Sequence, residues 1–278
     1  MRPRRPIYAL DYIEETIEAY TAVNKAPYAS EFSSSIAWAA VVLQKYFEAC
    51  GAHPTLERCA RRFETTKIPG TAQSLAKTEQ LSPYKRKLEQ LGCDFQKLET
   101  LTARRRSVRW FEQRPVPHTL LDQAVTLAAQ APSSCNRQSF HYRFYDHPEQ
   151  VKQIATIPMG TRGFAENIPC ICVLTGDLSA YFDERDRHAI YVDASLSAML
   201  FMLALETLDL ASCPLNWPDI ETNESAMTTC LKLPPYERPV FLIAIGYPDR
   251  DGEVASSPKS EIDLLRSYNR LGSYFEAQ

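Results

Sequence analysis

The chain has 278 residues, of which 45% are hydrophobic and 23% charged, with a formal net charge of −3. This length and balance are typical of a globular protein with a real core, in one large domain or two modest ones. With a pI near 6.0, the chain lacks the overall cationic field that attracts proteins to nucleic acid or anionic membranes. We therefore expect neither as a partner.

The N-terminal segment contains arginines but no apolar segment follows them, and no stretch approaches the roughly 20 apolar residues of a membrane span. We expect a cytoplasmic protein. The eight cysteines are spread along a chain too large to need disulfides, which favours reduced core thiols. Cys170 and Cys172 would share one face of a strand, and we expect no metal site there or at the five histidines, which lack ligand spacing.

The first third of the sequence predicts a helical N-terminal extension over residues 1–92. Apolar residues recur at three- and four-residue steps in residues 9–22, 34–49 and 55–63, and Gly51 would end the second of these helices. Residues 65–82 are polar and contain Pro69 and Gly70, which indicates a linker or a surface loop. No motif in this region carries chemistry.

From residue 93 the pattern alternates between helices and strands. Periodicity predicts helices at residues 95–105, 117–130 and 189–208, and apolar runs predict strands at residues 141–145, 169–175 and 239–247. The last two strands are apolar almost throughout, as in a sheet covered on both faces. The longest helix is hydrophobic nearly all round and must be buried from several sides. We expect an α+β or α/β sandwich over residues 93–278, and no dinucleotide fold or P-loop because their glycine motifs are absent from the sequence.

An arginine-rich segment at residues 104–111 is the most informative part of the sequence. If the preceding helix ends there, Arg105, Ser107 and Arg109 share one face, because alternate side chains of an extended chain do so. Guanidinium groups and a hydroxyl suit a phosphate and the polar edge of a heterocycle. Taken alone, a basic cluster at a helix C-terminus is more often a solvated end that complements the helix dipole. The segment by itself leaves both interpretations open.

Four segments, taken in order, resemble the nitroreductase family. They are Arg-Arg-Ser-Val-Arg-Trp-Phe at residues 105–111, Ala-Pro-Ser-Ser-Cys-Asn-Arg-Gln-Ser-Phe at 131–140, Ala-Ser-Cys-Pro-Leu-Asn at 211–216, and a last strand at 241–247 followed by Pro-Lys-Ser at 258–260. The resemblance implies a dimeric sandwich that binds flavin mononucleotide (FMN), and it implies roles for individual residues.

The family's phosphate and ring contacts fall on the arginine segment. The resemblance implies that Arg105 and Ser107 hold the FMN phosphate, with Arg106 beside them on the ribityl chain or ring edge. Arg109 would face the pyrimidine end of the isoalloxazine, where a cation stabilises the negative charge of the reduced ring. Lys259 would complete the phosphate site, although Glu261 stands where some members have a second basic residue.

Two further segments would complete the site. In the family the FMN site lies across a homodimer interface. The resemblance therefore implies that one loop contacts the FMN bound mainly by the other subunit, through Pro132, Ser133, Ser134 and Asn136. A second, flavin-facing loop would lie against the ring with Pro214, Leu215 and Asn216, while a backbone N–H or the Ser212 hydroxyl would donate to N5.

The resemblance implies a ping-pong oxidoreductase in which NADH or NADPH reduces FMN and an oxidised small molecule, such as a nitroaromatic or a quinone, then takes the electrons. No side-chain acid or base is required, so we predict no catalytic residue. Two alternatives stay open: a specialised member (a dehalogenase, a flavin-fragmenting enzyme or a biosynthetic oxidase) and a scaffold that has lost FMN. The acidic and aromatic lid of members that process iodotyrosine is not found in residues 149–167. Trp217 would either stack on the substrate or cap the following helix.

Overall fold

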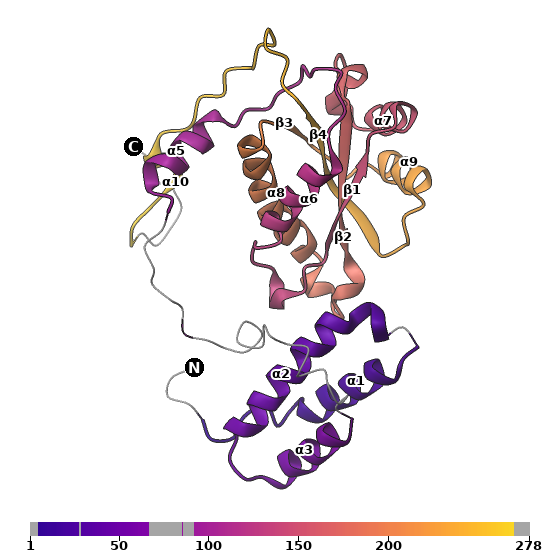
Figure 1. The fold of residues 1–278 in the computed structure, drawn as a ribbon, viewed down its shortest axis with the longest axis vertical. Coiled ribbons are helices and arrows are strands. Elements are labelled where there is room, and N and C mark those ends of the chain that lie inside the picture. The colour runs from indigo at the N-terminus through magenta and orange to yellow at the C-terminus, as the bar shows by residue number, and fades with distance from the viewer. Residues whose placement is uncertain (1–4, 28, 67–84, 86–91, 270–278) are drawn as a thin grey trace, which may run out of the picture. The chain divides into compact units, whose positions relative to one another are not determined.

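The computed structural model describes residues 5–27, 29–66, 85 and 92–269, and the chain divides into two compact units, Met1–Gln90 and Leu91–Gln278 (Figure 1). Among its described residues, the first unit contains the helices α1 (Ile13–Lys25), α2 (Ser33–Ala49) and α3 (Pro54–Thr66). Their apolar faces enclose a core that includes Ile17 and Phe63, and ion pairs from α3 to α1 join Arg58 to Glu14 and Arg62 to Glu18.

The first helix begins four residues later than its apolar spacing predicted. Ala9 adopts a left-handed φ of +63°, and the N–H of Ile13 bonds to its carbonyl, so residues 9–12 form a turn that precedes the helix. The linker predicted at residues 65–82 begins inside α3, and its remainder lies outside the described residues.

The second unit is built on a four-stranded sheet with the order β1-β2-β4-β3. Its strands, all paired antiparallel, are β1 (Phe140–Tyr145), β2 (Cys170–Asp177), β3 (Ala211–Leu215) and β4 (Glu237–Gly246). Its helices are α5 (Phe95–Arg104), α6 (His118–Ala128), α7 (Pro148–Ala155), α8 (Ala189–Thr207), α9 (Glu221–Leu231) and α10 (Ile262–Leu265).

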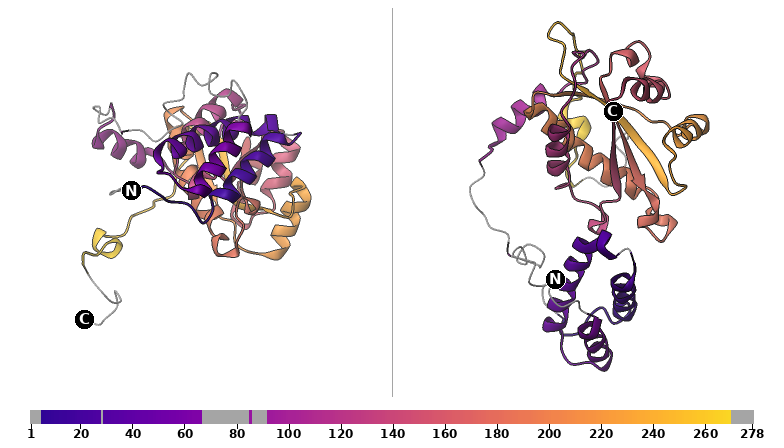
Figure 2. Two further views of the ribbon diagram at one scale, coloured as in Figure 1. Left: turned by 90° about the horizontal axis from the view of Figure 1, so that it is seen from below. Right: turned by 45° about the vertical axis from the view of Figure 1, so that its right-hand side comes forward.

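Helices cover both faces of this sheet, with α6 and α8 on one face and α7 and α9 on the other (Figures 1 and 2). Alternate residues of β2 enter the two cores: Cys170 and Cys172 pack with α6 and α8, whereas Ile171 and Val173 pack with α7 and α9. This confirms the predicted α+β sandwich and the shared face of the two cysteines. All eight cysteines lie in the described part and are free thiols.

The long helix α8 is the spine of this unit. It buries side chains such as Phe201 and Leu205 completely, and Asp209, with φ of +57°, turns the chain just after it. The expectation that no segment has the length and composition of a membrane span was wrong, because residues 184–207 pass that test. The most apolar 18-residue window of this segment is 56% buried inside the protein, as in the core helix of a globular domain.

The segment at residues 211–216, expected from the family resemblance as a flavin-facing loop, is mostly strand β3. It pairs with β4 from Ala211↔Gly246 to Leu215↔Leu242. Pro214 is tolerated because the strand lies at the edge of the four-stranded sheet, where a missing N–H costs little. β3 therefore places the predicted flavin-facing residues along the edge of the sheet.

Candidate functional site

The arginine segment begins where α5 ends. The Asp94 side chain caps the start of α5 by accepting from the N–H of Lys97 at 2.9 Å, and the helix ends at Arg104 because Arg105 turns to φ −57°, ψ 123°. The chain then extends beside β3: Ser107 pairs with Ser212, and the N–H of Val108 donates to the Ser212 carbonyl at 3.1 Å. Two segments more than a hundred residues apart in sequence thus meet at the sheet edge.

Three of the predicted site residues meet at one buried thiol. Burial raises the pKa of Cys213, whereas Arg109, a hydrogen bond from Ser107, and Arg105 all act to lower it. The Arg109 side chain also extends to within 5.8 Å of the Phe164 ring centroid. Ser107 thus lies within hydrogen-bonding reach of Cys213, and the charges of Arg105 and Arg109 are near enough to influence this thiol.

Glu206, near the end of α8, lies beneath the same segment. Its carboxylate accepts a backbone hydrogen bond from Arg106 and lies 3.4 Å from Nε of Arg104, whose Nη2 also lies 3.3 Å from Asp209. Burial raises the pKa of Glu206, and Arg104, Arg105 and Arg106 oppose this shift. Glu206 thus anchors the turn between α5 and the extended segment.

Arg104 and Arg106 differ from Arg105 in what their guanidinium groups contact. Arg104 is paired with two carboxylates, and Nη1 of Arg106 donates to the Arg105 carbonyl at 2.8 Å. No ion pair or hydrogen bond of the Arg105 guanidinium is found among the described residues. Of the three side chains, Arg105 is the most open to an external anion.

The predicted flavin-facing residues line a hollow at the end of β3. Its volume is about 380 Å³, within the roughly 300–1,000 Å³ of small-molecule sites. It is lined by Tyr191, Ser195, Pro214, Leu215, Asn216, Val240 and Phe241. Sequence reasoning missed Tyr191 and Phe241, which give this hollow its aromatic walls.

Ser212 does not open into this hollow. Its side chain is fully buried, and Oγ has no hydrogen-bond partner among the described atoms. A buried hydroxyl without a hydrogen-bond partner costs free energy of folding, so the Ser212 hydroxyl is an unusual feature of this sheet edge. The Ser212 hydroxyl could reach a flavin only if the surrounding chain moved.

The loop between α6 and β1 carries Pro132, Ser133, Ser134 and Asn136. It contains the short 3-10 helix η2 (Ser134–Asn136), and the N–H of Ser134 donates to the Asp193 carboxylate of α8 at 2.9 Å. Within the described residues, no hydrogen bond or ion pair joins this loop to the arginine segment. One chain therefore does not bring the two parts of the predicted site into direct contact.

Lys259 is also apart from the arginines. Residues 253–269 are exposed along their whole length, and Nζ of Lys259 bonds to Ser257 Oγ at 3.2 Å.

Trp217, in contrast, is buried, and its Nε1 donates to Glu224 of α9. Of the two roles expected for Trp217, packing on the following helix is the one observed.

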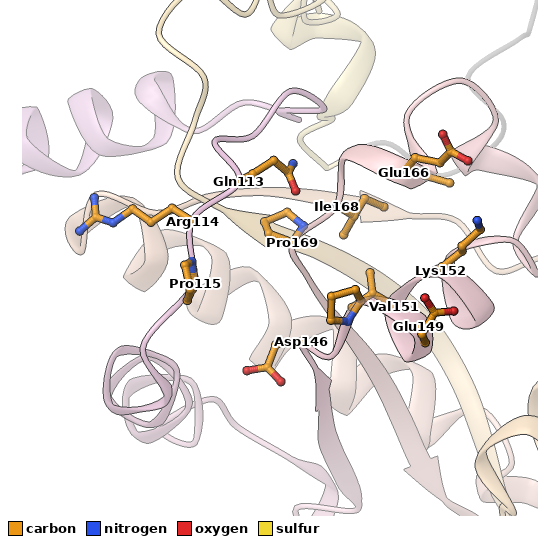
Figure 3. A pocket seen from close by; sticks show the side chains of 12 residues that line it. Gln113, Arg114, Pro115, Asp146, Glu149, Val151, Lys152, Glu166, Ile168 and Pro169 are labelled. Atoms are coloured by element: carbon orange, nitrogen blue, oxygen red, sulfur yellow. The ribbon is translucent and has the colours of Figure 1, made fainter.

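A second hollow lies between the chain after the arginine segment and α7 (Figure 3). Its volume is about 500 Å³, but no predicted site residue lines it. Arg114 at its rim points away from the other side chains and stacks 3.8 Å from the Tyr247 ring, and Asp146 bonds to His118 at 2.8 Å. Two of its charged side chains, Arg114 and Asp146, are thus engaged by residues that do not line the opening. Among the described residues, no cluster of three or more histidine, cysteine or acidic side chains could hold a metal ion.

Comparison with known proteins agrees with this fold. The model of the nitroreductase family matches residues 102–160 and 147–247, which is more than half of the chain. The chain belongs to the nitroreductase family. An NAD(P)H-dependent FMN reductase of Bacillus subtilis is 25% identical over 191 residues, which cover 62% of this chain and 76% of the relative. An NADH dehydrogenase of Thermus thermophilus is 25% identical over 185 residues, covering 55% and 88%.

Solved structures show the same fold. An FMN-dependent nitroreductase of Clostridium difficile superposes with a TM-score of 0.51 and 22% identity, covering 62% of this chain and 98% of its own. A nitroreductase family protein of Streptococcus pneumoniae gives a TM-score of 0.54 and 18% identity, covering 62% and 99%. These structures match the extent of a single sandwich unit and leave more than a third of this chain uncovered.

Proposed function

We propose that this protein takes electrons from NADH or NADPH and passes them, by a ping-pong mechanism, to an oxidised small molecule such as a quinone or a nitroaromatic compound. The general class is that of its family and relatives: an NAD(P)H-dependent flavin oxidoreductase with FMN as cofactor. The observation that carries the proposal is the position of the extended arginine segment, which pairs through Ser107 with Ser212 of β3, the edge strand that also lines the hollow.

The residues present fit FMN. Two guanidinium groups and a hydroxyl are the donors that a phosphate and the polar edge of a flavin need, and the guanidinium of Arg105 has no ion pair or hydrogen bond among the described residues. Bound FMN would supply the redox chemistry, accepting hydride from the nicotinamide and returning electrons to the second substrate. The protein itself then needs no acid or base side chain.

Individual residues would bind and orient the cofactor. Arg105 and Ser107 would hold the phosphate, with Arg106 alongside, and Arg109 would stabilise negative charge at the pyrimidine edge. Pro214, Leu215 and Asn216 would line the ring's side of the hollow and limit the access of water. Lys259 would join the phosphate contacts from the exposed C-terminal segment.

A homodimer would complete the site. α8 exposes an apolar stripe, formed by Val192, Leu196 and Met199 at three- and four-residue steps, with 57%, 45% and 40% of each residue exposed. Exposed stripes of this kind mark protein interfaces. A second copy packed on α8 would bring the loop at residues 132–136 of one subunit to the arginine segment of the other, which a single chain does not do.

Steady-state kinetics with the FMN-loaded protein test the reaction. NADH or NADPH is varied at several fixed concentrations of a quinone or a nitroaromatic compound. We expect parallel double-reciprocal lines, because the first product leaves before the second substrate enters the same pocket. Intersecting lines would contradict the ping-pong mechanism. Bound FMN without turnover of any acceptor would favour a specialised member of the family, and loss of FMN binding would favour a scaffold.

A further inference from the structure

The loop between α6 and β1 has a strained backbone. Cys135, Asn136 and Gln138 have φ angles of +51°, +55° and +50°, in the left-handed region that residues other than glycine rarely adopt. Such conformations persist only where surrounding contacts hold them, and they often occur at ligand sites. Some of these contacts are internal to the loop: the N–H of Gln138 donates to Ser133 Oγ at 3.0 Å, and the N–H groups of Asn136 and Arg137 donate to the carbonyls of Ser133 and Ser134, both at 3.0 Å.

The other contacts form a buried chain of hydrogen bonds that ends on α8. Oδ2 of Asp193 accepts from the N–H of Ser134 and from the hydroxyl of Tyr181, both at 2.9 Å. The Tyr181 hydroxyl has a single proton, which it gives to Asp193, so the Ser139 hydroxyl, 2.9 Å away, must be the donor to the Tyr181 oxygen. Asp193 and Ser139 are each only 3% exposed and Tyr181 9%.

This chain ties both ends of the loop to one carboxylate. Ser134 is bonded to Asp193 directly, and Ser139 is bonded through Tyr181, so the strained residues 135–138 lie between two anchored points. Because the acceptor is ionised and buried, these bonds are stronger than bonds between neutral groups. Asp193 therefore holds the loop from outside, in addition to the hydrogen bonds within the loop.

We infer that Asp193 is a positioning residue for cofactor binding: acting with Tyr181 and Ser139, it fixes the loop that presents Ser133, Ser134 and Asn136 to the flavin. This inference rests on the proposed function. Asp193 is adjacent in α8 to Val192 of the exposed apolar stripe, so one helix sets both the loop geometry and the surface proposed for the second subunit.

A matched pair of tyrosine variants tests this role. Tyr181→Phe removes only the hydroxyl that links Ser139 to Asp193. Tyr142→Phe removes a comparable hydroxyl, which bonds to Ser197 Oγ at 2.8 Å on the same helix but does not touch the loop. Each variant loses one hydrogen bond to α8, which is buried for Tyr181 and part-buried for Tyr142. A general loss of stability would therefore appear in both variants.

Two measurements on the full-length protein separate the variants. In the FMN-free protein, amide hydrogen exchange of a peptide covering residues 132–139 should be about tenfold faster in Tyr181→Phe than in the wild type, since local opening becomes easier. The FMN dissociation constant, measured by quenching of flavin fluorescence, should rise by about fivefold or more through the loss of one bond to a charged group. Tyr142→Phe should change neither value.

Asp193→Asn provides a second variant, which we expect to exceed Tyr181→Phe in both effects because it removes the charge that orders the chain. If Tyr181→Phe fails to fold, Ser139→Ala cuts the same chain at its outer link. Equal exchange rates and equal FMN affinities in the Tyr181 and Tyr142 variants would overturn the inference. A wild-type protein that does not bind FMN would instead contradict the proposed function, while the exchange rates still test the anchoring by Asp193.

Discussion

Two acidic residues of α8 lie behind the two parts of the proposed FMN site. Glu206 holds the arginine turn through the Arg106 backbone and the Arg104 side chain, and Asp193 holds the loop through Ser134. They are the two charged residues in α8, whose sequence is otherwise apolar or small and polar. Burying a carboxylate is costly unless it is paired, so both positions indicate a specific partner.

Arg105→Ala should weaken FMN binding by about 1.5–3 kcal/mol, roughly tenfold to a hundredfold in the dissociation constant, because a charge-assisted bond to phosphate is lost. Arg61→Ala is the control: this arginine is exposed on α3, in the other unit of the chain, and has no predicted contact with FMN, so the dissociation constant should stay close to the wild-type value. Fluorescence titration with FMN measures both. An unchanged affinity in Arg105→Ala would remove Arg105 from the site.

Site residues could be predicted from the sequence where local spacing decides their direction. Arg105, Ser107 and Arg109 lie in an extended segment, and their alternation alone predicts a shared face. The position of Ser212 could not be predicted in this way, because its burial depends on how β3 packs against α8 and β4. Asp193 and Glu206 were missed, although a charge within an apolar helix is a signal that the sequence does contain.

At the scale of the elements, a largely buried ion pair stabilises the sheet by joining β1 to β4 across β2, the strand between them. Glu237 of β4 accepts two bonds from Arg143 of β1, at 2.9 and 2.6 Å, and one from Thr175 of β2. Burial raises the pKa of Glu237, but the bonds from Arg143 and Thr175 outweigh it and leave the pKa below its ordinary value. The folded state therefore binds the Glu237 proton less readily than the unfolded chain does.

This pKa shift predicts a pH dependence of stability. The contribution of Glu237 is fully present above the carboxyl pKa of the unfolded chain and is lost as pH falls through the lower pKa of the folded state. Glu237→Gln should cost about 2 kcal/mol at neutral pH, since Arg143 stays partly hydrated when its partner loses charge. Urea unfolding should give a smaller difference from wild type at about pH 4 or below, where the wild-type contribution is being lost.

Glu253→Gln, in an exposed part of the C-terminal segment, is the control for this experiment, and it should lower the free energy of unfolding at neutral pH much less than Glu237→Gln does. If the cost of Glu237→Gln were the same at both pH values, the ionised pair would not be what stabilises the sheet.

Most elements could be predicted, including the polar helix α5 and the short strand β1, whereas α7, α9 and β3 could not. α8, β2 and β4 carry continuous hydrophobic patterns, and the structure confirms them to within a few residues. α7 has only eight residues and α9 buries only Met227, so neither gives a clear periodicity. β3 was missed as a strand because Pro214 indicates a turn unless the edge position of the strand is known.

At the scale of the whole molecule, the second unit leaves apolar surface uncovered on α8 and along its C-terminal segment. The segment exposes Ile262, Leu264 and Leu265 by 59–69% as well as Lys259, and α8 exposes Leu196. Large apolar side chains gathered on one helix are unusual on a monomer. A homodimer would cover this surface and would join the two parts of the cofactor site.

Leu196→Glu should therefore convert the dimer into a monomer of 31.6 kDa and weaken FMN binding at the same time. Size-exclusion chromatography with light scattering gives the mass, and the FMN titration gives the affinity. Met159→Glu alters an equally apolar residue, 71% exposed, near α7 on the other side of the sheet, and should change neither. A Leu196→Glu protein that remains dimeric would exclude the α8 stripe as the interface.

The most direct measurement for the central claim is an FMN titration of the purified full-length protein, followed by flavin absorbance and fluorescence. We expect a yellow protein that binds one FMN per chain and whose flavin absorbance bleaches when NADH or NADPH is added without oxygen. A colourless protein that takes up no added FMN would contradict the assignment of Arg105, Ser107 and Arg109 to a flavin site, and with it the proposed function.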